Sequence, residues 1–117
     1  MDVEQIREYC LSKPNVEESL PFGPDVLVFK IGGKIFLLLP LNTEHLQFNV
    51  KSNPDEIELL RENFSCVLPG YHMNKKHWNT IVPNASVTTK QLYQWIDESY
   101  TIIYNQLPKK ARDTLFT

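Results

Sequence analysis

The sequence predicts an α+β fold, with three main helices packed on an antiparallel sheet rich in hairpins. Two apolar runs, residues 26–31 and 34–39, are separated only by Gly32-Gly33, a link that is typical of a tight hairpin. The helix signals fall near the start, in the middle and near the end of the chain, and they do not alternate regularly with strands. This order favours helices packed on an antiparallel sheet over repeated βαβ units.

The chain begins with an amphipathic helix signal. Asp2 is a capping residue, and Val3, Ile6 and Cys10 recur on one stripe, so we expect a helix that ends near Lys13-Pro14. Residues 17–20 then fit a short strand, and the proline and glycine residues at 21–24 indicate a turn.

The Gly-Gly hairpin fixes where its two lysines point. In an unbulged two-residue turn Ile31 pairs with Lys34 and Lys30 pairs with Ile35, so the two lysines fall on opposite faces of the hairpin. The same register puts Leu27, Phe29, Phe36 and Leu38 on one face and Val26, Val28, Ile35 and Leu37 on the other. Both faces are mostly apolar, so we expect cover on both sides.

Alternating polar and apolar residues at 45–51 predict a half-exposed strand whose outer face is polar and free of acids. Asn53-Pro54 then reads as the start of a helix to about Asn63, with Arg61 and its acidic neighbours largely in solvent. Residues 78–82 fit a short strand. Thr88 is expected to cap the longest helix, which stops at Pro108 and leaves a basic tail, residues 109–117, as helix or coil.

The 117 residues and 42% hydrophobic content fit one globular domain spanning residues 1–117. The apolar runs are too short for a membrane helix and the N-terminus is acidic, so we expect a cytoplasmic protein with no membrane partner. Cys10 and Cys66 are expected to be free, buried thiols. A nucleophilic pair of Cys66 with His72 is the less favoured alternative, because it depends on spatial placement.

Charge is divided unevenly along the chain, although the net charge is only −2. Residues 1–62 hold eleven acids against six lysines and arginines, and no acid occurs between Glu62 and Asp97. Within this acid-free stretch, residues 69–80 read PGYHMNKKHWNT and combine two aromatic rings, two histidines and two lysines. Lysines neutralise phosphates and aromatic rings stack on bases, so this segment suits an anionic, base-bearing partner.

The sequence gives little support for a metal site, a cofactor site or a catalytic site. His72 and His77 are five residues apart and have no third ligand in a metal-binding motif, so we expect neither a metal nor a cofactor. The sequence has no phosphate-binding loop and no GxSxG elbow, and we expect no catalysis. A purely structural alternative stays open, in which Trp78 and Met73 pack inward, Tyr71 shapes a turn and the lysines are solvated.

Several segments together resemble the MmcQ/YjbR family of small bacterial proteins. They are Pro21-Phe22-Gly23, Val28-Phe29-Lys30-Ile31 with Gly33-Lys34, Leu59-Leu60-Arg61, PGYHMNKKHWNT and Ser99-Tyr100. The resemblance spans nearly the whole chain and implies an α+β fold with a "double wing" sheet, similar to the DNA-binding domain of a phage transcription factor. It also implies DNA binding, by analogy of fold.

Carried onto this sequence, the resemblance implies a nucleic-acid-binding surface. Its candidate residues are Lys30, Lys34, Tyr71, His72, Asn74, Lys75, Lys76, His77 and Trp78. The acidic first half of the chain differs from a dedicated DNA-binding domain, so binding would be weak or confined to one face. Two rival hypotheses use the same segment, for an acidic protein partner or for a small anionic ligand. The oligomeric state is left open, with a monomer as the simplest case.

Overall fold

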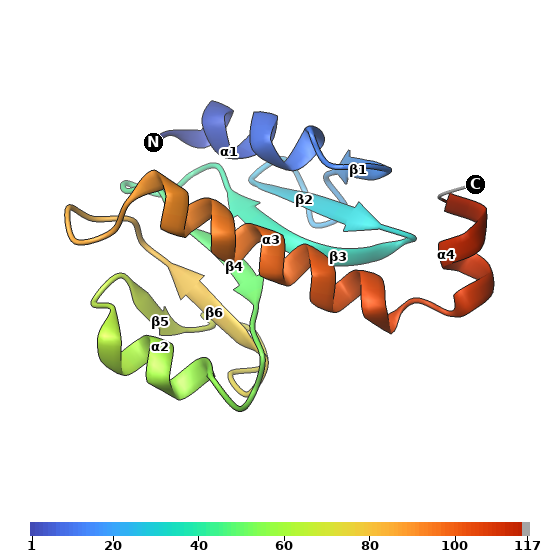
Figure 1. The fold of residues 1–117 in the computed structure, drawn as a ribbon. Coiled ribbons are helices and arrows are strands. Elements are labelled where there is room, and N and C mark those ends of the chain that lie inside the picture. Colours follow the sequence, from blue (N-terminus) through green and yellow to red (C-terminus); the bar gives the residue numbers. More distant parts are fainter. Residues whose placement is uncertain (116–117) are drawn as a thin grey trace.

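The computed structural model describes residues 1–115 and shows helices packed against one six-stranded sheet (Figure 1). The helices are α1 (Val3–Leu11), α2 (Ile57–Asn63), α3 (Thr89–Gln106) and α4 (Lys109–Leu115). The strands are β1 (Val16–Ser19), β2 (Val26–Ile31), β3 (Lys34–Pro40), β4 (Phe48–Lys51), β5 (Val67–Pro69) and β6 (Trp78–Ile81). The predicted α+β class with an antiparallel sheet is confirmed.

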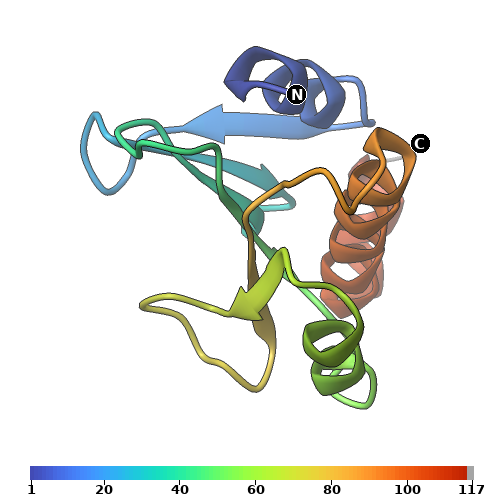
Figure 2. The same cartoon turned by 90° about the vertical axis from the view of Figure 1, so that its left-hand side faces the viewer.

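The sheet order is β1-β2-β3-β4-β6-β5, and every neighbouring pair is antiparallel. The long helix α3 crosses one face, where Phe29, Phe36, Phe48 and Ile96 belong to the buried core. Figure 2 shows the helices gathered on one side, while the loops before β2 and before β6 project from the other side.

The hairpin turn agrees with the sequence prediction. Gly32 and Gly33 both have positive φ, and the register pairs Ile31 with Lys34 and Lys30 with Ile35, so the lysines do lie on opposite faces. Beyond these pairs the predicted register is wrong, because a β-bulge shifts it between Phe29 and Lys30. Phe29 pairs with Leu37 instead of Phe36, since the bulge adds one residue to β3.

Other elements differ from the prediction at their boundaries. Asn53 caps a turn through its side chain, which accepts from the Asp55 amide, and α2 begins only at Ile57. Strand β4 begins at Phe48, three residues later than expected. Strand β5 was not predicted, because its three residues give too short a pattern to stand out. The basic tail is helical as α4, and residues 116–117 lie outside the described residues.

The two capped helices begin where the sequence indicates. Asp2 and Gln5 form a reciprocal capping box at α1, and Thr88 accepts from the Gln91 amide at α3. Within residues 1–115, no helix combines the length and the apolar character that crossing a membrane would require.

The junction of β3 and β4 is held by a side chain from the helix layer. These strands pair at Leu37 with Val50 and at Leu38 with Asn49, and the next pair in that register would be Phe36 with Lys51. There the hydroxyl of Ser99 on α3 intervenes. It accepts from the Lys51 amide at 2.8 Å and donates to the Phe36 carbonyl at 2.5 Å. Ser99 is completely buried, and its hydroxyl pairs these two backbone groups where the β3–β4 ladder ends.

Replacing Ser99 with alanine should destabilise the fold. The change leaves a buried amide and a buried carbonyl without partners, at a cost of about 2 to 4 kcal/mol in unfolding free energy. Chemical denaturation measures this cost. Thr101→Ala, at an exposed position of the same helix, is the control and should change the unfolding free energy by no more than about 0.5 kcal/mol. Equal stabilities of the two variants would show that Ser99 does not hold this junction.

Candidate functional site

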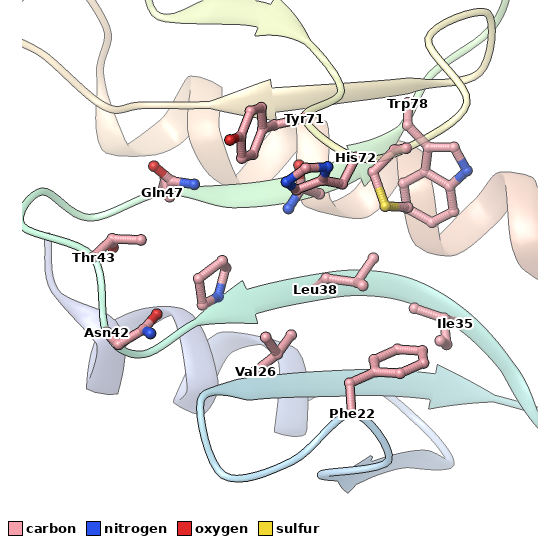
Figure 3. A pocket seen from close by; sticks show the side chains of 13 residues that line it. Phe22, Val26, Ile35, Leu38, Asn42, Thr43, Gln47, Tyr71, His72 and Trp78 are labelled. Carbon is pink, nitrogen blue, oxygen red and sulfur yellow. The ribbon is translucent and has the colours of Figure 1, made fainter.

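A concave cleft opens on the sheet face opposite α3, with a volume of about 540 Å³ (Figure 3). Its floor comes from the middle of the sheet, and its walls come from the loop before β2 and the loop before β6. The lining residues are Phe22, Val26, Ile35, Leu38, Pro40, Asn42, Thr43, Gln47, Asn49, Tyr71, His72, Met73 and Trp78. Most of the lining surface is apolar.

Aromatic rings stand on both walls of the cleft. Phe22 rises from one side, and Tyr71, His72 and Trp78 occupy the other, with Leu38 on the floor between them (Figure 3). Phe22 is 64% exposed and Tyr71 is 67% exposed, values that are high for such large apolar side chains. The Tyr71 and His72 rings lie against each other with centroids 4.0 Å apart. The walls can therefore offer flat faces to a ligand.

The backbone of the loop before β6 has a specific shape. Gly70 lies so close to its surroundings that a Cβ atom there would come within 2.9 Å of both the Met73 Cβ and the Trp78 carbonyl oxygen. His72 adopts a φ of 59°, which is uncommon for a residue with a side chain. The amide of Tyr71 donates to the Thr80 hydroxyl of β6 at 2.9 Å. These constraints place the rings of Tyr71 and His72 at the cleft.

Arg61 of α2 clamps the same loop from outside the cleft. Its Nε donates to Oδ1 of Asn79 at 2.8 Å, and its Nη2 donates to the carbonyl oxygens of Lys75 and Trp78. Asn79 is fully buried, so its acceptor has no access to water. The prediction that Arg61 lies largely in solvent is wrong, because the planar guanidinium reaches three acceptors at once.

Two amide side chains lie among the apolar residues that line the cleft. Asn49 of β4 is only 6% exposed, and its Oδ1 accepts from the Thr80 hydroxyl at 2.5 Å. Gln47 lies two residues earlier and also lines the cleft. The floor therefore carries two amide groups among apolar side chains.

The structure separates the predicted site residues into groups. Tyr71, His72 and Trp78 line the cleft, whereas Asn74, Lys75, Lys76 and His77 lie in the same loop but do not. Lys30 stands directly opposite Glu17 in the sheet, and Lys34 lies on the other face of the hairpin. The nine residues therefore do not form one continuous surface. Trp78 and Met73 are half-buried at the cleft and Lys75 and Lys76 are exposed, so the structural alternative stays open.

Both cysteines are free and buried, as predicted. Burial raises the pKa of the Cys10 thiol to about 12, and it also raises the pKa of Cys66. Both thiols therefore stay protonated at neutral pH, which disfavours a Cys66 nucleophile. Among residues 1–115, no group of three or more histidine, cysteine or acidic side chains is arranged to hold a metal ion.

Sequence reasoning overlooked three contributors to the site. Phe22 looked like part of a turn, and Asn49 looked like one of several outward polar residues on a strand. Arg61 looked like a solvated helix residue. Arg61 and Phe22 both lie in segments that carry the family resemblance, and that resemblance was the sequence signal that could have identified them. Asn49 gave no signal, because its burial depends on strands and loops that meet only in three dimensions.

Comparisons with known proteins agree on one family. A family model described as YjbR matches residues 11–102. The uncharacterized protein YbdF of Escherichia coli O157:H7 is 37% identical over 107 residues, covering 92% of this chain and 88% of the relative. The uncharacterized protein YjbR of E. coli K12 is 30% identical over 115 residues, covering 98% of each chain.

Two solved structures are also similar. The crystal structure of Deinococcus radiodurans protein DR2400, described as a DUF419 domain, has a TM-score of 0.87 at 29% identity and covers 97% of this chain and 86% of its own. A crystal structure of a Pseudomonas syringae protein has a TM-score of 0.77 at 26% identity, covering 88% of this chain and 99% of its own.

Removing the Arg61 guanidinium should loosen the loop before β6. Arg61→Ala leaves the buried Asn79 acceptor unpaired and should lower the unfolding free energy by about 2 to 4 kcal/mol. Arg61→Lys should recover little of this loss, because one ammonium group cannot reproduce the planar fork. Denaturant midpoints of both variants test this, with Glu62→Ala, at an exposed neighbouring position, as the control. Wild-type stability in Arg61→Ala would contradict the clamp.

Proposed function

This chain belongs to the YjbR family, and we propose that it is a non-catalytic binding module whose cleft receives a small, mainly apolar ligand. One observation carries the proposal: aromatic rings on two separate loops face each other across an apolar, concave floor (Figure 3). Such an arrangement suits a flat molecule held between ring faces.

Size and exposure both support this role. The cleft volume of about 540 Å³ lies within the range of roughly 300 to 1,000 Å³ that is usual for ligand pockets. Phe22 and Tyr71 keep more than half of their surfaces in water, although a folded chain usually covers side chains of this size. Contiguous exposed apolar surface of this kind commonly marks a binding site.

We propose a neutral ligand and not an anionic one, because the lysine and arginine side chains of the described residues lie outside the cleft. Among the residues that the structure describes, neither a lysine nor an arginine lines the cleft. We place the protein in the cytoplasm as part of the same proposal, since free cysteines are typical of a reducing compartment.

A neutral fluorescent probe, N-phenylnaphthylamine, tests the cleft. Its fluorescence should rise on binding to wild type, and Phe22→Ala and Tyr71→Ala should each weaken the affinity about threefold to tenfold, as expected for the loss of one aromatic contact. Both side chains are exposed, so the stability should change little. Leu59→Ala removes another exposed apolar side chain outside the cleft and should bind like wild type. Wild-type affinity in both aromatic variants would rule out the cleft as the site.

Nucleic-acid binding is a second candidate, favoured by one observation. Lys75 and Lys76 are exposed side by side on a loop that Arg61 holds in shape, and no acid lies between Glu62 and Asp97 in the sequence. A pair of exposed lysines on an ordered loop can contact phosphates. Lys30 and Lys34 add little to this patch, because one faces Glu17 and the other lies on the opposite face. We therefore expect weak binding of duplex DNA, micromolar or weaker.

Salt titration of a labelled DNA duplex tests this second candidate. Two phosphate contacts predict a slope of log affinity against log salt of about −2. Replacing Lys75 and Lys76 together with alanine should abolish the binding and spare the fold. Replacing Lys109 and Lys110, a second pair of adjacent exposed lysines, is the control and should leave the affinity unchanged. Absence of binding at low salt, or an equal loss with the control pair, would eliminate the DNA hypothesis.

A further inference from the structure

We infer that the ligand of the cleft carries a neutral carbonyl oxygen, and that Nδ2 of Asn49 donates a hydrogen bond to it. The inference rests on the proposed ligand-binding function and specifies the chemistry of the ligand. It arises from the contrast between a polar, buried side chain and the apolar floor in which that side chain lies.

The orientation of the Asn49 amide is set by a chain of hydrogen bonds. The Tyr71 amide donates to the Thr80 hydroxyl, so this hydroxyl directs its own proton to Oδ1 of Asn49. Oδ1 is thereby engaged and Nδ2 is turned away from Thr80. Each bond in such a chain polarises the next, which strengthens the remaining N–H donors.

The amide nitrogen of Asn49 has no hydrogen-bond acceptor among residues 1–115. Asn49 is 6% exposed and lines the cleft. Its Nδ2 is not among the fully buried atoms that lack a partner, so it keeps accessible surface and can donate to a ligand in the cleft. An acceptor on a bound ligand would satisfy Nδ2, and the side chain of Gln47, in the segment that leads into β4, lines the same cleft.

The floor favours a neutral acceptor over a carboxylate. Val26, Ile35 and Leu38 surround the amides with apolar surface, and no lysine or arginine of the described chain lines the cleft. Burying a carboxylate without a cation is far more costly than burying a ketone, an ester or an amide. The expected ligand is therefore a flat apolar body, held between Phe22 and Trp78, with a carbonyl group at the floor.

Two probes of nearly equal shape test the inference. Acetylnaphthalene has a ketone oxygen where isopropenylnaphthalene has a methylene group, so the pair differs in the acceptor alone. In an NMR titration of wild type, we expect the ketone to bind about tenfold more tightly, as one net hydrogen bond provides. The side-chain amide resonances of Asn49 should shift with the ketone and stay nearly fixed with the hydrocarbon.

Asn49→Asp provides the matched variant. An aspartate keeps the shape and the acceptor for Thr80 but has no Nδ2 donor, so the tenfold preference for the ketone should vanish. The side-chain amide shifts of wild type test the same bond if this variant does not fold. Naphthoate, the carboxylate analogue, should bind more weakly than the ketone.

The outcomes separate this inference from the proposed function. Equal binding of ketone and hydrocarbon to wild type, with fixed Asn49 resonances, overturns the inference and leaves the cleft as a ligand site. Failure of both probes and of N-phenylnaphthylamine to bind overturns the proposed function itself. Tighter binding of naphthoate than of the ketone overturns the assignment of a neutral ligand.

Discussion

The architecture depends on the hydroxyl of Ser99, which takes the place of a strand-to-strand hydrogen bond between β3 and β4. The direct pairing of β3 with β4 ends at Leu37 with Val50, one position before the Ser99 hydroxyl. With the side chain inserted, the backbone groups of Phe36 and Lys51 remain paired beyond the last β3–β4 pair, and the six strands stay in one sheet. The cleft lies on the opposite face of the same sheet, between the loop before β2 and the loop before β6. The same two strands meet the helix layer at Phe36 and Lys51 and contribute the neighbouring residues Leu38 and Asn49 to the cleft.

Rigidity at the cleft comes from contacts that lie outside it. Arg61 holds the loop before β6 by the carbonyl groups of Lys75 and Trp78, while the close packing of Gly70 fixes the start of that loop. The rings of Tyr71 and His72 are thereby ordered without being buried. Aromatic groups that are held in place before binding lose less conformational freedom when a ligand arrives, so they can contribute more to affinity.

Local patterns were sufficient for most of the fold but not for the site. Gly32-Gly33 and the capping residues Asp2 and Thr88 act through neighbours in sequence, and the elements they start are present. The bulge opposite Phe29 and the short strand β5 arise from tertiary packing, which overrides simple alternation. The cleft residues Phe22, Asn49 and Trp78 come from separate segments. These residues come together because of the order of the strands in the sheet, which the hydrophobic periodicity of the sequence does not predict.

The segment PGYHMNKKHWNT consequently serves several roles. Gly70, Asn79 and Thr80 are buried and shape the loop and its strand, whereas Tyr71 and His72 present rings to the cleft. The lysines lie outside the cleft lining, so a ligand held at Asn49 need not contact them. Under the proposed function, recognition in the cleft depends on ring faces and amide donors and draws little on the charge of the lysines. The cleft rings Tyr71 and His72 and the exposed lysines Lys75 and Lys76 therefore lie at different places on one loop, whose backbone Arg61 holds through the carbonyl groups of Lys75 and Trp78.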